Sequence, residues 1–170
     1  MKKILFCLLL SVWFFSCDNS HYKKEGNTEI YRFESSFFSP DEVIPMIRVK
    51  LGEDKGRNMV IDTGSVINIL NESYYNKHKN DYTVIDSVCT PITTINGTTE
   101  NEVTYVVKGY INDSIPVEYY IMDISSPLEA IFITQKIQVE GLLGVKFLRK
   151  NKIKIDFQNK TVTKHCYDAI

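Results

Sequence analysis

Hydrophobic and polar residues alternate along much of the chain after residue 43, with the two-residue period of a half-buried β-strand. Residues 44–51 follow this pattern. The turn-forming segment 52–56, which contains two glycines, then leads into residues 58–61, of which 59–61 are apolar. The two segments predict a β-hairpin that ends immediately before Asp62.

Three further hairpins are predicted downstream. The first turns at Asn96-Gly97, a dipeptide that tolerates the positive φ angles of a type I′ turn. The others turn at residues 112–114 and 158–160. The strands predicted to flank these turns span residues 92–95, 98–107, 106–111, 115–122, 152–157 and 161–162.

Helical signals are few. Residues 71–78 are expected to form a short helix with Asn71 as its cap, and residues 147–150 suggest a single helical turn. The sequence therefore predicts an all-β fold, mainly β and closed like a barrel, with one or two short helices and no second domain.

The N-terminus carries a different pattern. Met1-Lys2-Lys3 precedes an almost unbroken apolar run over residues 4–15, which is typical of an export signal. The run is shorter than the roughly 20 apolar residues that a transmembrane helix needs. A retained membrane anchor is the alternative interpretation.

Ser16-Cys17 follows the apolar run and resembles the lipobox of bacterial lipoproteins, although Phe14-Phe15 departs from its commoner form. The resemblance implies cleavage before Cys17, acylation of Cys17 and an exported, membrane-anchored protein on the periplasmic face or the cell surface. The expected organisation is a signal peptide (1–16), a lipidated polar tether (17–30) and a folded domain (31–170).

Composition excludes some functions. From Cys17 onward the chain has 18 basic and 21 acidic residues, and no basic patch interleaved with aromatic residues predicts nucleic-acid binding. The three histidines lack the spacing of metal ligands, so no metal or other cofactor is expected. Cys89 and Cys166 remain as a possible pair in an oxidising compartment, and the sequence does not decide whether they join.

Candidate chemistry lies at Asp62-Thr63-Gly64-Ser65, which follows the apolar run 59–61. A carboxylate can activate water, a threonine hydroxyl can hold a tight loop, and glycine allows the backbone to approach the carboxylate closely. The tripeptide Asp-Thr-Gly arises by chance in roughly a few per cent of chains of this length. By itself it also suits an ordinary turn.

A second element, Leu142-Leu143-Gly144, changes this picture. Together the two motifs, in this order and separated by hairpins, resemble the retropepsin-like (retroviral-type) aspartic peptidases over residues 44–162. The resemblance implies that Asp62 is catalytic, that Thr63, Gly64 and Ser65 complete its loop, and that Leu142, Leu143 and Gly144 form a strand supporting the loop. It also implies a flap at Asn96-Gly97. Lys146 departs from the aspartate that is frequent there in bacterial members.

The implied reaction needs two carboxylates that share one proton, because two such close negative charges cannot both ionise. The segments that begin at Asp86, Asp113 and Asp123 lack the glycine, so a homodimer with one Asp62 from each chain is expected. The predicted activity is an aspartic endopeptidase acting on extended polypeptides. The alternatives are a catalytically inactive, retropepsin-like peptide-binding lipoprotein and an unrelated surface β-lipoprotein.

Overall fold

The computed structural model describes residues 22–25, 28–32, 35–38, 44–93 and 99–166, with side chains described within 44–89 and 103–164. These ranges contain twelve β-strands, three α-helices and one 3₁₀ turn. In chain order they are β1 (Tyr22–Glu25), β2 (Thr28–Arg32), β3 (Ser35–Phe38), β4 (Pro45–Leu51), β5 (Asp54–Ile61), β6 (Ile69–Asn71), α1 (Glu72–Lys77), the 3₁₀ turn η1 (Lys79–Asp81), β7 (Thr83–Thr93), β8 (Thr99–Ile111), β9 (Ile115–Met122), α2 (Ser125–Gln135), β10 (Gly141–Leu143), α3 (Val145–Lys150), β11 (Ile153–Asp156) and β12 (Thr161–Cys166).

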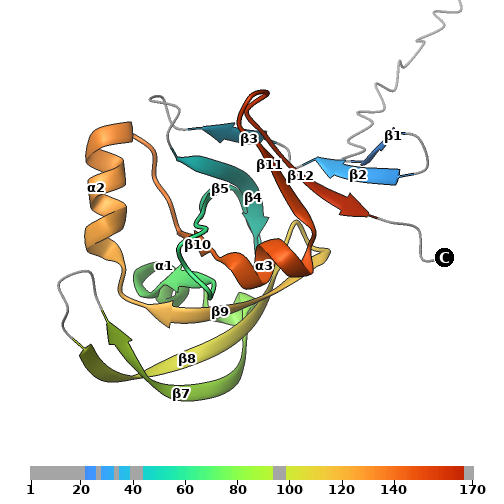
Figure 1. The fold of residues 1–170 in the computed structure, drawn as a ribbon. Helices are drawn as coiled ribbons and strands as arrows, with labels where there is room; N and C mark the ends of the chain where they lie inside the picture. Colours follow the sequence, from blue (N-terminus) through green and yellow to red (C-terminus); the bar gives the residue numbers. More distant parts are fainter. Residues whose placement is uncertain (1–21, 26–27, 33–34, 39–43, 94–98, 167–170) are drawn as a thin grey trace, which may run out of the picture.

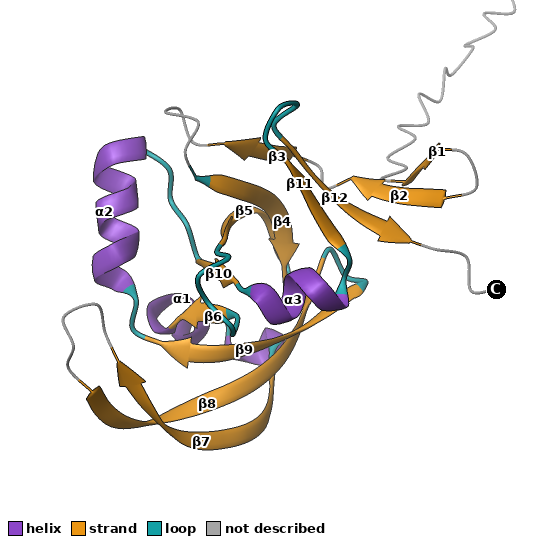
Figure 2. Ribbon diagram, viewed as in Figure 1, coloured by secondary structure: helices purple, strands orange, loops and turns teal. Residues whose placement is uncertain are grey.

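Six strands form a closed barrel in the order β4-β5-β10-β6-β9-β8 (Figure 2). The pairing of Leu51 with Ile111 joins β4 to β8 and closes the ring. β3 and β7 extend the sheet from β4 and β8, and a second sheet has the order β1-β2-β12-β11. The predicted all-β, barrel-like fold is therefore confirmed.

Strand alternation fills the barrel with apolar side chains. On β4, Ile47, Val49 and Leu51 are fully buried, whereas Arg48 between them is exposed. β9 buries every second side chain in the same way. The inward side chains of β9 are Ile115, Val117, Tyr119 and Ile121.

A second apolar cluster lies on the outer face of the barrel and is covered by α2, which Figure 1 shows standing at one side of the molecule. The sequence did not predict α2. Its apolar side chains do not gather on one face, because Leu128 is buried while Phe132 and Ile133 remain half exposed. The sequence of α2 therefore shows no clear amphipathic period. The helix packs on the barrel through Leu128 and the half-buried Ile131, which belong to the outer cluster.

The N-terminal strands also differ from expectation. β1 and part of β2 lie within residues 17–30, where a polar tether was predicted. β2 pairs antiparallel with β12, in a register that joins Arg32 to Thr163. Backbone hydrogen bonds to a strand more than 100 residues away thus organise a segment whose local pattern shows no periodicity. None of the helices in the described part of the chain is long and apolar enough to cross a membrane.

Candidate active site

Asp62 follows β5 directly, where the chain leaves the barrel. Its backbone N–H donates to the carbonyl of Leu143 at 3.0 Å, which continues the parallel pairing of β5 with β10 by one residue. Its side chain is half-buried. The end of a core strand therefore fixes the backbone at the carboxylate, while the carboxylate itself stays accessible.

Local hydrogen bonds hold the loop that follows. The N–H of Gly64 donates to Oδ1 of Asp62 at 2.8 Å, and Oγ of Ser65 donates to the carbonyl of Ile67 at 2.8 Å. The sequence suggested that the hydroxyl of Thr63 holds this loop. Thr63 is instead exposed, and its hydroxyl makes no hydrogen bond to the described residues.

The Leu142-Leu143-Gly144 element lies directly beside this loop. β10 sits between β5 and β6, with Leu142 opposite Val60 on one side and Ile69 on the other. The start of α3 then holds the loop from behind. The N–H of Val145 donates to the carbonyl of Ser65 at 2.8 Å, and that of Lys146 to the carbonyl of Val66 at 3.2 Å.

The backbone around Gly144 leaves no space for a side chain at this position. A Cβ at this position would overlap the carbonyl oxygen of Ile67 and lie 2.7 Å from that of Ser65. The φ angle of Gly144 is −90°, which any residue can adopt, so conformational freedom is not the reason for glycine here. Only a residue without a side chain allows β10 to approach the Asp62 loop this closely.

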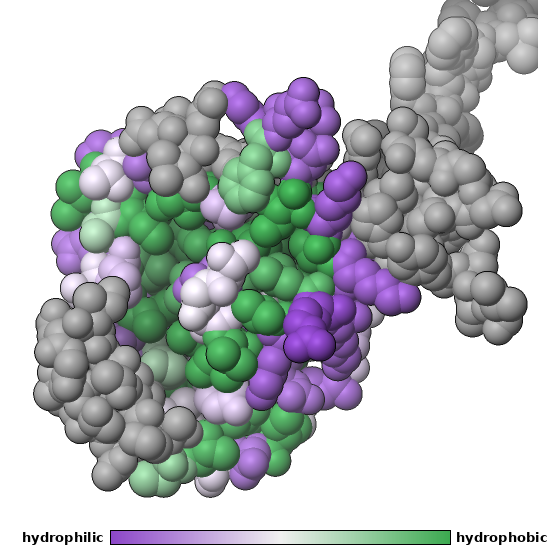
Figure 3. Space-filling model, in the orientation of Figure 1, coloured by the Kyte–Doolittle hydropathy of each residue, from purple (hydrophilic) through white to green (hydrophobic). Residues whose placement is uncertain are grey.

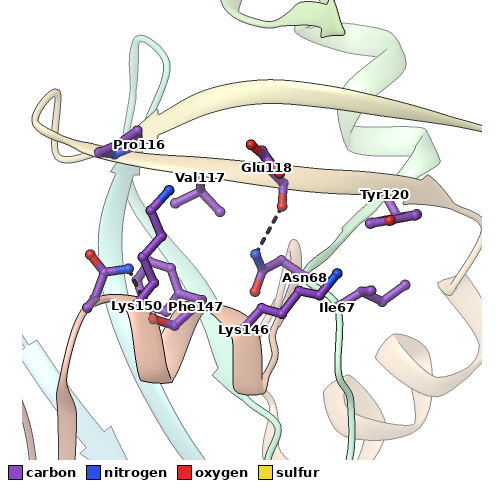
Figure 4. Close-up of a pocket in the computed structure, with 10 residues that line it drawn as sticks. Ile67, Asn68, Pro116, Val117, Glu118, Tyr120, Lys146, Phe147 and Lys150 are labelled. Atoms are coloured by element: carbon purple, nitrogen blue, oxygen red, sulfur yellow. Dashed lines mark hydrogen bonds between the residues drawn. The ribbon is translucent and has the colours of Figure 1, made fainter. Parts of the chain in front are cut away.

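Asn68 connects the Asp62 loop to Gly144 after β10 and to β9, a role that the sequence did not predict. Its buried side chain accepts from the N–H of Gly144 at 2.9 Å and donates to the carbonyl of Glu118 at 3.0 Å (Figure 4). The backbone carbonyl of Asn68 accepts from the N–H of Tyr120 at 2.9 Å. One feature of the sequence could have indicated this role: Asn68 is the polar residue in the otherwise apolar segment 66–70. A side-chain amide that is buried among apolar residues needs hydrogen-bond partners.

Replacing Asn68 with alanine is expected to lower the free energy of unfolding by about 2–3 kcal/mol. The buried N–H of Gly144 would lose its acceptor, and an unsatisfied buried donor costs most of its desolvation energy. Urea denaturation measures the change. The exposed Asn80→Ala is the matched control and should shift stability by less than about 0.5 kcal/mol. Equal effects at both positions would contradict the role given to Asn68.

The face that carries Asp62 is apolar. Val60 lies two residues earlier, so strand alternation brings both side chains to the outer face of the barrel. Val60 and the half-buried Leu142 belong to the cluster beneath α2. The strand that ends at Asp62 therefore borders an apolar cluster, and Figure 3 shows hydrophobic side chains gathered at the centre of one face of the molecule.

A partly buried group of ion pairs anchors the start of β10. Arg57 contacts Oδ2 of Asp54 at 2.9 Å and Oε1 of Glu140 at 3.3 Å. Burial raises the pKa of Glu140 above its ordinary value, and the opposing charge of Arg57 offsets part of this effect. The backbone of Glu140 also bonds to Asn58 and Asn71, so the residue before Gly141 is held from both sides.

A cavity of about 300 Å³ lies between β9 and α3 and is lined by ten residues (Figure 4). Asn68, Phe147 and the exposed Lys146 are among them, and Asp62 is not. The cavity is therefore behind the Asp62 loop and not at its carboxylate. In Figure 4 the side chain of Lys146 extends from α3 toward Ile67, and it makes no ion pair with the described residues.

Other predicted site residues lie outside the described ones. Cys17 precedes them, and Asn96 and Gly97 fall in the interval 94–98 between β7 and β8. The arms of that hairpin are present as antiparallel strands from Thr83 to Ile111. Cys89 on β7 is exposed and free. Among the described residues, no three His, Cys, Asp or Glu side chains converge as metal ligands.

Two solved structures are similar to this chain. The first, "a retropepsin-like aspartic protease from Rickettsia conorii", is 13% identical over 85% of this chain and 98% of its own, with a TM-score of 0.46. The second, the "retroviral protease-like domain of Ddi1 from Leishmania major", is 10% identical over 80% of this chain and 92% of its own, with a TM-score of 0.42. The strand topology itself defines the fold. No protein-family model matches the sequence, and a search of curated proteins finds no match.

Proposed function

We propose that this chain is one half of an aspartic endopeptidase, with Asp62 as its catalytic carboxylate. The observation that carries the proposal is the loop after β5. A half-buried carboxylate accepts from the Gly64 N–H, and β10 and α3 hold the loop from behind. In the proposed reaction one Asp62 carboxylate takes a proton from water, which attacks the peptide carbonyl, while the protonated partner hydrogen-bonds the developing oxyanion.

The second carboxylate is proposed to come from a second copy of the chain. The other aspartates considered have roles elsewhere. Asp113 pairs with Lys50 at 2.9 Å, and Oδ1 of Asp123 accepts from the N–H of Ser125 at the start of α2. Asp86 is exposed on β7. None of them sits in a loop like that of Asp62.

The tip of the Asp62 loop suits contact with such a second copy. Val66 is 63% exposed although it is apolar, and Thr63 beside the carboxylate is exposed as well. We expect Val66→Glu to disfavour the dimer, because it would introduce one charge from each chain close to a shared axis. Sedimentation should then give a monomer, and peptide cleavage should fall in parallel.

Val84→Glu is the control for that variant. Val84 is a 52% exposed apolar residue on β7, away from the Asp62 loop. It should leave the sedimentation coefficient unchanged. A wild-type chain that sediments as a strict monomer and still cleaves peptides would overturn the homodimer.

The proposed substrate is an extended polypeptide with apolar side chains. The half-buried Leu142 beside the Asp62 loop and the exposed Val66 within it offer apolar surface near Asp62, and β7 is the last strand of its sheet among the described residues. An unpaired strand edge can bind a peptide backbone by strand addition. Incubation with a mixed peptide library from acid to neutral pH tests the proposal. Peptide binding without cleavage, in the wild type and Asp62→Asn alike, would favour a binding module.

We also propose that the chain is an exported lipoprotein anchored through Cys17. The support is the apolar run 4–15 followed by Ser16-Cys17. In a bacterial host, Cys17→Ser should move the protein from the membrane fraction to the soluble fraction or leave its signal uncut. An unchanged mass and unchanged membrane association would contradict the anchor.

A further inference from the structure

Positive charge is concentrated near the end of the chain. Residues 146–164 contain seven Lys or Arg and a single acid, Asp156. From Cys17 to Val145 the chain contains 11 basic and 19 acidic residues. The small net charge of the whole protein therefore conceals an acidic body joined to a strongly basic segment.

The fold places these cations on exposed surface. Lys146, Arg149 and Lys150 have the i, i+3 and i+4 spacing of one helical face on α3. Lys152 precedes β11, Lys154 lies within it, and Lys160 lies in the turn to β12. We call these six exposed residues the basic strip: Lys146, Arg149, Lys150, Lys152, Lys154 and Lys160. Figure 3 shows hydrophilic side chains along α3 and β11 and at the β11–β12 turn, beside the hydrophobic centre of that face.

Four cations of the strip have no acidic partner among the described residues. No acidic side chain of the described part of the chain forms an ion pair with Lys146, Arg149, Lys150 or Lys154. The carboxylate of Asp156 is occupied by the turn, where it accepts from the backbone N–H of Asn159 at 2.9 Å and from its side-chain amide at 3.0 Å. By contrast, Arg57 elsewhere in the fold contacts two carboxylates. These four side chains thus project a positive field into solvent.

An apolar residue stands among these charges. Phe157 begins the β11–β12 turn, between Lys154 and Lys160 in the sequence, and is 65% exposed. Its neighbours 158–160 are exposed and polar. A phenylalanine at the tip of a cationic hairpin can enter the interface of a lipid bilayer while the lysines remain at the headgroups.

The N-terminal side of the chain reaches the same sheet. β1 and β2 share their sheet with β12 and β11, and Tyr22, the first residue of β1, is five residues after Cys17. Five residues span at most about 17 Å. A membrane that held Cys17 would therefore lie within a short distance of this sheet.

We infer that the basic strip and Phe157 form a docking surface for a membrane that contains anionic phospholipids. Each Lys or Arg near such a surface strengthens binding by about fivefold, or about 1 kcal/mol, and the attraction decays within a Debye length. Phe157 adds an apolar contact that salt does not screen. The surface acts independently of peptide cleavage, and it fixes the side of the domain that faces the lipid.

Vesicle sedimentation tests this surface. The chain from Asp18 retains every described strand, lacks Cys17, and should bind vesicles of phosphatidylcholine with added phosphatidylglycerol but not phosphatidylcholine alone. Replacing Lys146, Arg149, Lys150 and Lys154 by glutamine should weaken binding by a hundredfold or more, on the order of four fivefold steps. Phe157→Ser should lower the binding that persists at high salt.

The control changes the same number of charges elsewhere. Glutamine at the exposed Lys55, Lys77, Lys79 and Lys108 lowers the net charge equally and should leave vesicle binding within about fivefold of the wild type. Equal losses in both quadruple variants would overturn the surface, and so would binding that ignores phosphatidylglycerol. Binding of the wild type to polyglutamate or DNA, with no binding to vesicles, would instead identify an acidic macromolecule as the partner.

Discussion

Replacing Asp62 with asparagine is expected to lower peptide cleavage by at least about a thousandfold. In the proposed homodimer one substitution removes both carboxylates, so the site loses its base and its acid together. The amide keeps an oxygen that can accept from the Gly64 N–H. The loop should therefore persist, and the free energy of unfolding should change by less than about 1 kcal/mol.

The measurement compares cleavage of a single library-derived peptide with urea denaturation of the same preparations. Asp123→Asn is the matched control, because Asp123 is exposed and lies outside the loop. It should leave cleavage within about twofold of the wild type. Cleavage that survives in Asp62→Asn, or that falls equally in both variants, would remove Asp62 from the catalytic role.

Gly144→Ala is expected to have the largest effect on stability, with a loss of about 3 kcal/mol in the free energy of unfolding. The added methyl group would meet the carbonyl oxygens of Ile67 and Ser65, which belong to the backbone and cannot rotate aside. Either β10 or the Asp62 loop must shift. The hydrogen bonds from Val145 to Ser65 and from Gly144 to Asn68 then lengthen.

Cleavage by the folded fraction of Gly144→Ala should also fall, by about a hundredfold, since a displacement of about 1 Å misplaces the carboxylates. Gly109→Ala is the control. A Cβ at Gly109 would lie 2.7 Å from the ring of Tyr82, a side chain within the barrel core. That variant should lose stability while each folded molecule keeps its activity. The opposite result, full activity per folded Gly144→Ala molecule, would show that β10 does not position Asp62.

Much of the candidate site was visible in the sequence. Asp62-Thr63-Gly64 follows the apolar residues 59–61. In Leu142-Leu143-Gly144, two apolar residues precede a glycine. Both were expected to meet, and the structure brings them together through the hydrogen bond from Asp62 to Leu143. The predicted hairpin at residues 112–114 is also present, with positive φ at Asn112 and Asp113. The hairpin depends on turn chemistry and strand period, which are local, whereas the meeting of the two motifs was implied by the family resemblance.

Other features depended on distant contacts. Asn68 is important because Gly144 and Glu118 both reach it, 76 and 50 residues further along the chain. α2 packs its buried residues against the outer face of the barrel, although its own apolar residues show no clear helical period. β2 needs β12 as its partner. The basic residues of segment 146–164 are visible in the sequence, but α3 and β11 bring Lys146, Lys150 and Lys154 onto exposed surface.

The sequence by itself determined the strand-rich character of the chain, the turns that end its hairpins, and Asp62 as the residue with the strongest chemical signal. Each follows from residue type and short spacing. Only the tertiary structure decided how the barrel closes, which backbone groups hold the Asp62 loop, and which surface carries the basic strip. These outcomes depend on hydrogen bonds and packing between residues far apart in the chain, and no local pattern specifies such pairings.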